Sequence, residues 1–158
     1  MKINFTLFML ILLNFLMGCG YQPLLDEKQR RYSIESFIVN DEGDVRLGQI
    51  LVNSIGASKS DFNKLSLNIK AKKDRSVSGK SSAGKVLEYT IDLTFDLVAV
   101  DTLTQNVVLK KVYKNSNSYK KSNVYLDTLN NEKKITKNLT VNIAEQVVSD
   151  LTLLYGIK

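Results

Sequence analysis

The most constraining feature of this 158-residue chain is a strict alternation of apolar and polar side chains between residues 87 and 99. One set of alternate positions is apolar: Leu87, Tyr89, Ile91, Leu93, Phe95, Leu97 and Ala99. The positions between them carry Glu88, Thr90, Asp92, Thr94 and Asp96. Because successive side chains of a strand point to opposite faces, the pattern predicts a long strand in an antiparallel sheet with one buried and one wet face.

Three further segments carry strand signals. Residues 32–39 are rich in β-forming side chains, and residues 65–72 alternate between apolar and polar. Residues 107–114 repeat the alternation after a turn, except that Lys111 falls on the apolar side, which indicates a bulge or a frayed strand end. On the wet face we expect Lys70, Lys72, Lys110 and Lys114 to flank the acids of the long strand as cross-strand pairs.

Two helices are predicted to cover the apolar face. Capping chemistry at Asn40-Asp41-Glu42 precedes Leu47, Leu51 and Ile55, which recur at i+4 spacing before a stop near Gly56. A second helix is predicted from about Thr128 to Tyr155. The order β-α-β-β-β-α predicts an α/β (α+β) two-layer sandwich, in which two helices lie on one face of a mostly antiparallel four-stranded sheet.

The N-terminus has the form of a bacterial lipoprotein signal. Lys2 and a short apolar run lead to Gly18-Cys19, which predicts a signal peptide at 1–18, a lipid on Cys19, a tether at 19–31 and a single domain at 32–158. The alternatives are an uncleaved leader or a transmembrane helix, although residues 3–17 are shorter than the roughly 20 residues that a span needs. Gly20 is not the aspartate that often retains lipoproteins in the inner membrane, so we expect an outer-membrane location.

Composition narrows the function. The chain has no histidine and one cysteine, which removes His-based and Cys–His catalysis and the usual zinc sites. We expect a protein that is not an enzyme and has no cofactor apart from the covalent lipid on Cys19. The formal net charge of +6 favours an acidic partner, such as lipid phosphates or an acidic protein cavity. Nucleic acid is not expected outside the cytoplasm.

Two polar, basic segments are candidate binding sites. The segment 73–85 reads as a long loop and carries Arg75, Lys80 and Lys85, and the segment 115–123 carries Lys120 and Lys121 beside Tyr119. The functional hypothesis is contact with the phosphates of a lipid or glycolipid through lysines and free backbone N–H groups. The alternative is a solvated hairpin tip and a solvated linker. A phosphate-binding loop at residues 79–81 is excluded, because Asp74 stands where that motif needs its first glycine.

The sequence resembles the lipopolysaccharide-assembly lipoproteins of the LptE family, in its alphaproteobacterial branch. The similarity rests on the following segments: Cys19-Gly20-Tyr21-Gln22-Pro23-Leu24, Glu88-Tyr89 at the start of the long strand, Lys111-Val112-Tyr113, Asn131-Glu132, and Ala144-Glu145-Gln146. The resemblance implies a small α/β sandwich that plugs an LptD-type outer-membrane β-barrel, helps it assemble and binds lipopolysaccharide without catalysis.

Family binding residues are basic and lie before the Glu-Tyr strand and before the last helix. The resemblance assigns the first place to Arg75, Lys80 or Lys85. At the second place Leu126 or Leu129 replaces the family's lysine, and Lys120, Lys121 and Lys133 are its neighbours. Two other hypotheses remain open. One is a periplasmic adaptor lipoprotein of a lipid-transport ATPase system, and the other is a lipid-anchored enzyme that uses Ser81 or Ser82 with Lys80.

Overall fold

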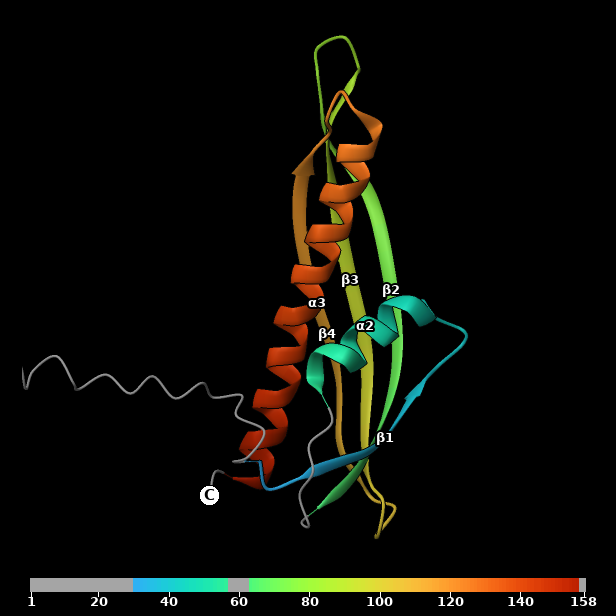
Figure 1. Cartoon of the computed structure of the whole chain (residues 1–158), viewed down its shortest axis with the longest axis vertical. Helices are drawn as coiled ribbons and strands as arrows, with labels where there is room; N and C mark the ends of the chain where they lie inside the picture. The colour runs from blue at the N-terminus through green and yellow to red at the C-terminus, as the bar shows by residue number, and fades with distance from the viewer. Residues whose placement is uncertain (1–29, 57–62, 157–158) are drawn as a thin grey trace, which may run out of the picture.

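The computed structural model describes residues 30–56 and 63–156 (Figure 1). The predicted signal peptide, Cys19 and all of the tether before Arg30 lie outside the described residues. The described elements are β1 (Ser33–Val39), α2 (Val45–Ile55), β2 (Lys64–Lys80), β3 (Val86–Asp101), β4 (Val107–Lys120) and α3 (Tyr125–Tyr155).

The strands form a sheet with the spatial order β1-β2-β3-β4. β1 pairs with β2 in parallel, and the pairs β2–β3 and β3–β4 are antiparallel. Both α2 and α3 lie on the same side of this sheet, with α3 running along the length of the long strands (Figure 1). The predicted two-layer fold, its element order and its mostly antiparallel sheet are confirmed.

The core lies between the alternating face of β3 and the two helices. Its β3 members, from Ile91 to Ala99 at alternate positions, are at most 1% exposed. The helices contribute Leu47, Leu51 and Ile55 from α2 and Leu139, Ile143, Ala144, Val147, Val148 and Leu151 from α3. Since each large aliphatic side chain gains about 1.5–3 kcal/mol on full burial, this layer is the main source of stability.

The start of α2 differs from the prediction. Asp44 caps the helix, because its Oδ1 atom accepts a hydrogen bond from the backbone N–H of Leu47 at 2.9 Å. Asn40 instead accepts from the N–H of Glu42 at 2.8 Å and closes a turn before the helix. α2 also packs closely on β1, since a Cβ atom added at Gly48 would lie 2.5 Å from Cγ1 of Val39.

The predicted loop at 73–85 and linker at 115–123 are largely strand. β2 continues to Lys80 and β4 to Lys120, so β2, β3 and β4 extend past the core as a long three-stranded ladder. In the first segment only residues 81–85 lie between strands. In β2 the alternation disappears after Ala71 because side chains on both sides of the strand are largely exposed, while backbone pairing with β3 continues. The backbone N–H groups that were expected to be free are therefore mostly engaged in the sheet.

Candidate functional site

Four of the predicted binding residues meet at one end of the sheet. The strand register places Lys80 opposite Val86 and Lys120 opposite Glu88, and the backbone N–H of Lys121 donates to the carbonyl of Leu87 at 2.8 Å. Lys85 lies in the turn between β2 and β3, and all four lysines are exposed. We call this end of the molecule, together with its exposed apolar side chains, the tip surface.

The tip surface is apolar as well as basic. Large apolar side chains that are 45–75% exposed come from β2, the start of β3 and the start of α3: Val77, Leu87, Val124, Tyr125 and Leu126. α3 begins at Tyr125, three residues earlier than predicted, after Val124, which makes no side-chain capping bond. The acidic side chains in this region are Glu88 and Asp127, so lysines outnumber them. Cationic and apolar groups side by side are suited to an anionic amphiphile.

Arg75, the fifth predicted residue, is held in a cluster below the tip surface that we call the Glu132 clamp. Glu132 of α3 accepts hydrogen bonds from Lys73 Nζ at 2.9 Å, Arg75 Nη1 at 3.0 Å and Tyr119 Oη at 3.0 Å. The guanidinium of Arg75 also lies 4.7 Å from the ring centroid of Tyr89. Arg75 therefore has a structural role that joins the sheet to α3.

Burial raises the pKa of the Glu132 carboxyl, but the hydrogen bonds from Lys73, Arg75 and Tyr119 outweigh it and hold that pKa below its ordinary value. The pKa of Tyr119 is raised, first by burial and then by its hydrogen bond to Glu132. Tyr119 is only 6% exposed, so it serves the Glu132 clamp and offers little surface to a ligand.

A second clamp holds the other half of α3. Asp150 accepts from Lys111 Nζ at 2.7 Å and from Tyr113 Oη at 2.6 Å. Lys111 therefore does face the helices, and its charge is matched there. The strand pair does contain a register shift, but it lies between Ala99 and Val100, opposite Leu109 and the 59% exposed Val107, and not at Lys111, which stays in register opposite Leu97.

The sheet face opposite the helices is polar. Its hydroxyl groups pair across strands, with Thr90 Oγ1 2.7 Å from Ser118 Oγ and Ser36 Oγ donating to Ser66 Oγ at 2.8 Å. The predicted cross-strand charge pairs are mostly wrong. Lys70 lies opposite Asp96 in register, but its amine pairs with Glu42 at 2.8 Å.

Sequence reasoning did not predict the two clamps. One signal was present in the sequence. The alternation places three tyrosines, Tyr89, Tyr113 and Tyr119, on the helix-facing side of β3 and β4. The hydroxyl group of a buried tyrosine needs a polar partner, so an acidic side chain on the covering helix could have been expected. Among the described residues there is no group of three or more acidic, histidine or cysteine side chains that could hold a metal ion. Within the same part of the chain, no helix has both the length and the apolar character needed to cross a bilayer.

Comparison with solved structures shows that the chain shares its fold with bacterial lipoproteins. A predicted lipoprotein from Caulobacter crescentus CB15 gives a TM-score of 0.59 at 15% identity, over 82% of this chain and 90% of that chain. Rare lipoprotein B from Shewanella oneidensis gives a TM-score of 0.55 at 13% identity, over 75% of this chain and 92% of that chain. A minor lipoprotein from Acinetobacter baumannii gives a TM-score of 0.52 at 15% identity, over 78% of this chain and 91% of that chain. No family model and no curated protein matches the chain. At these identities, the likeness shows that the chain has the fold of these lipoproteins.

Proposed function

We propose that the protein is an outer-membrane lipoprotein, anchored through a lipid on Cys19, that plugs an LptD-type β-barrel, helps it assemble and binds lipopolysaccharide during transport to the outer leaflet. The observation that carries the proposal is the tip surface, where Lys80, Lys85, Lys120 and Lys121 surround exposed apolar side chains. Lipopolysaccharide presents phosphates beside acyl chains, which is the complementary chemistry. The lipoprotein fold supports this role, and the role requires no catalysis.

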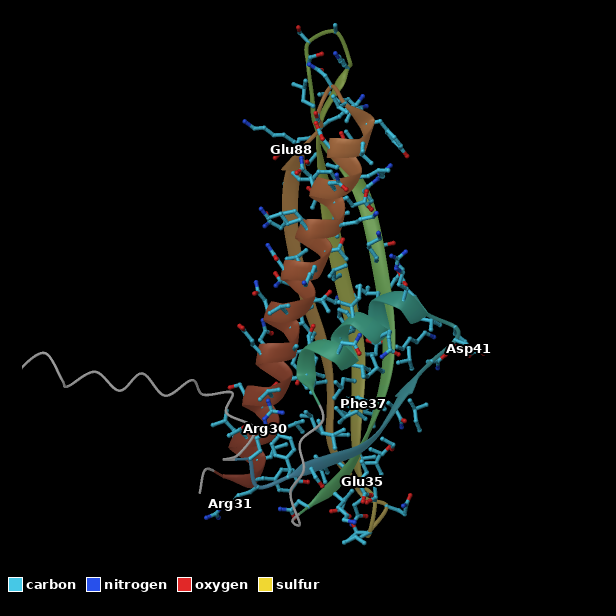
Figure 2. All side chains as sticks on the ribbon, in the orientation of Figure 1. Arg30, Arg31, Glu35, Phe37, Asp41 and Glu88 are labelled. Atoms are coloured by element: carbon cyan, nitrogen blue, oxygen red, sulfur yellow. The ribbon has the colours of Figure 1, made fainter. Side chains whose placement is uncertain are left out.

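The ends of the molecule support the same role. Arg30, where the described chain begins, and Glu88, beside the tip surface, lie at opposite ends of the elongated domain (Figure 2). A chain anchored before Arg30 would therefore present its binding end away from the anchored end. The polar face of the sheet, with its paired hydroxyl groups, offers a surface that can dock against the water-lined wall of a barrel.

Two experiments test the proposal. Crosslinking of the native protein followed by mass spectrometry should recover an outer-membrane barrel protein, and depletion should leave lipopolysaccharide in the periplasm. Unchanged surface lipopolysaccharide after depletion contradicts the proposal. Co-purification with inner-membrane transporter subunits instead of a barrel would favour the adaptor of a lipid-transport ATPase system.

The ligand site is tested separately. Replacing all four lysines of the tip surface by glutamate should weaken lipopolysaccharide binding at least about tenfold and lower its salt dependence, because each lysine supplies a charge-assisted contact. Position is tested with two single variants that each change the charge by two units, Lys120→Glu at the tip surface and Arg31→Glu, since Arg31 is exposed and lies near Arg30 at the other end of the molecule (Figure 2). Equal losses in the two variants would show a general charge effect and remove the assignment.

A further inference from the structure

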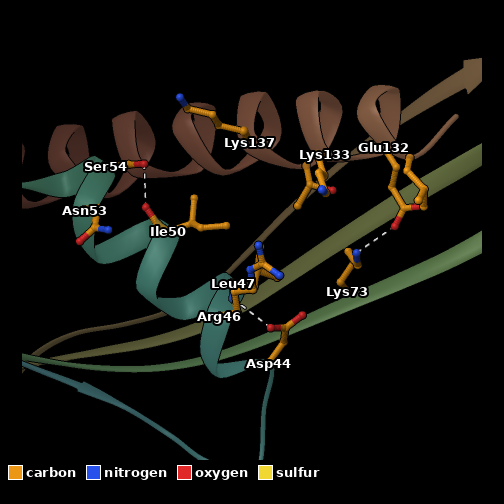
Figure 3. A pocket seen from close by; sticks show the side chains of 12 residues that line it. Asp44, Arg46, Leu47, Ile50, Asn53, Ser54, Lys73, Glu132, Lys133 and Lys137 are labelled. Carbon is orange, nitrogen blue, oxygen red and sulfur yellow. Dashed lines mark hydrogen bonds and ion pairs between the residues drawn. The ribbon is translucent and has the colours of Figure 1, made fainter. Parts of the chain in front are cut away.

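A groove separates the two helices on the covered side of the sheet. α2 crosses α3 at an angle, so that the two helices approach each other near the end of α2 and diverge toward its start (Figure 1). The groove has a cavity volume of about 650 Å³. Its walls come from α2 and α3, and Lys73 of β2 lies at its base (Figure 3).

The charges of this groove are unevenly matched. Its two acids are already engaged, because Asp44 caps α2 and Glu132 belongs to the clamp with Lys73. Arg46 of α2 and Lys133 of α3, on opposite walls, have no ion-pair or hydrogen-bond partner in the described part of the chain (Figure 3). Lys137, one turn after Lys133, is equally unpaired among those residues. An anion between the helices would therefore meet cations from both walls.

The same groove offers apolar surface and one unused polar atom. Leu47, Ile50 and Leu129 line it beside the basic residues. Thr136, which also lines it and is 8% exposed, carries a buried hydroxyl that has no hydrogen-bond partner within the described chain. Unpaired buried hydroxyls are rare because each costs about 1–3 kcal/mol, so this side of the groove is not fully satisfied by the described residues.

We propose that the groove between α2 and α3 binds an anionic amphiphile, namely an alkyl or acyl chain that carries a phosphate headgroup. The headgroup lies between Arg46 and Lys133, and the chain lies on Ile50 and Leu129. The volume falls in the range of about 300–1,000 Å³ that is usual for small-ligand sites. The site is separate from the tip surface and does not depend on the proposed function.

The test uses a photoreactive probe on the full acylated chain in dodecyl maltoside micelles. A dodecyl phosphate that carries a diazirine is titrated and photolysed, and labelled peptides are identified by mass spectrometry. We expect labelling within residues 44–54 and 129–137. The double variant Arg46→Glu, Lys133→Glu should need about tenfold more probe for half-labelling, because it replaces both cations that meet the headgroup.

Matched controls separate this site from other sources of binding. Lys134→Glu changes the same charge on α3 at an exposed position that does not line the groove, and it should shift half-labelling less than about twofold. Ile50→Trp should block labelling by filling the groove, with thermal unfolding unchanged. The glutamate variant of the four tip lysines should label normally in the groove, which separates this proposal from the proposed function.

Several outcomes overturn the proposal. Equal labelling by the uncharged dodecanol analogue would show an apolar cavity without headgroup recognition. Displacement of the probe by the same concentration of inorganic phosphate would show a free-phosphate site. Labelling confined to residues 77–87 and 120–126 would place amphiphile binding at the tip surface alone, and protection only by an acidic helical peptide would make the groove a protein-docking site.

Discussion

The Glu132 clamp allows a stability prediction to be worked out in detail for Glu132→Ala. The substitution removes the acceptor shared by Lys73, Arg75 and Tyr119. A hydrogen bond to a charged group contributes about 1.5–3 kcal/mol, and the bond from Tyr119 counts at about 2 kcal/mol because Glu132 has only 14% side-chain exposure. The two ion pairs add about 0.5 kcal/mol each, since Lys73 and Arg75 are 32% and 46% exposed. We therefore expect a loss of about 3 kcal/mol in the free energy of unfolding.

The measurement is thermal unfolding of the full chain in detergent at pH 7, followed by far-UV circular dichroism. A loss of this size should lower Tm by roughly 10 °C in a domain of this length. Glu145→Ala is the control, since Glu145 is an exposed acid on the same helix with no partner in the described chain, and it should change stability by less than about 0.5 kcal/mol. Tyr119→Phe alone should cost about 2 kcal/mol, with a similar coupling energy to Glu132→Ala in a double-mutant cycle.

The pH dependence follows from the pKa of Glu132. That pKa is depressed in the folded chain, because the three donors outweigh the effect of burial. The clamp's stabilisation should therefore be complete above the unfolded value of about 4.3 and be lost as the pH falls through the lower folded value. Glu132→Gln should remove this acid-dependent part. Additive effects of Glu132→Ala and Tyr119→Phe, or an unchanged acid profile in Glu132→Gln, would refute the reasoning.

Three other results are expected. Asp150→Ala should cost about 2 kcal/mol in the free energy of unfolding, because it leaves the Tyr113 hydroxyl without its acceptor; chemical denaturation should show this. In the same assay Thr136→Val should be neutral or slightly stabilising, because the Thr136 hydroxyl has no hydrogen-bond partner in the described chain. Thr140→Val should cost about 1 kcal/mol, because the Thr140 hydroxyl donates to the carbonyl of Thr136 at 2.8 Å. Cys19→Ser should abolish acylation, seen by mass spectrometry as loss of the acylated N-terminal peptide; an N-terminal peptide that carries no lipid in the unchanged protein would contradict the anchor.

The part of the fold that encloses the core could be predicted from the sequence, because buried apolar residues recur there at the spacing of a strand or a helix. Ile91, Phe95 and Leu97 repeat every two residues, and α2 and α3 repeat their apolar side chains at helical spacing. Past Ala71 the helix-facing positions of β2 become exposed, and the pattern no longer distinguishes strand from loop. β2 continues there because its backbone still pairs with β3 along one edge, while β4 pairs with the other edge of β3, which is a non-local effect.

The candidate site was predicted only in part for a related reason. Sequence reasoning identified four lysines of the tip surface as candidate binding residues, because each belongs to a local cluster of positive charge in a polar segment: Lys80, Lys85, Lys120 and Lys121. That these clusters share one end of the sheet follows from the register of three strands. Arg75 was assigned to the ligand because sequence shows its charge but not its partner, and Glu132 lies 57 residues away in the chain.

The position of the clamp explains how the molecule can carry a binding end that the core does not stabilise. The buried apolar residues of β2 end at Ala71, so the last part of the ladder gains little from the hydrophobic core. The Glu132 clamp ties that part to α3 through charged and hydroxyl groups, which tolerate water nearby. Beyond the clamp, side chains at the tip surface contribute little to stability, so lysines and exposed apolar groups can be placed there for a ligand at small cost to the fold. The same separation predicts that charge changes at the tip surface alter binding without altering unfolding, whereas changes at Glu132 do the reverse.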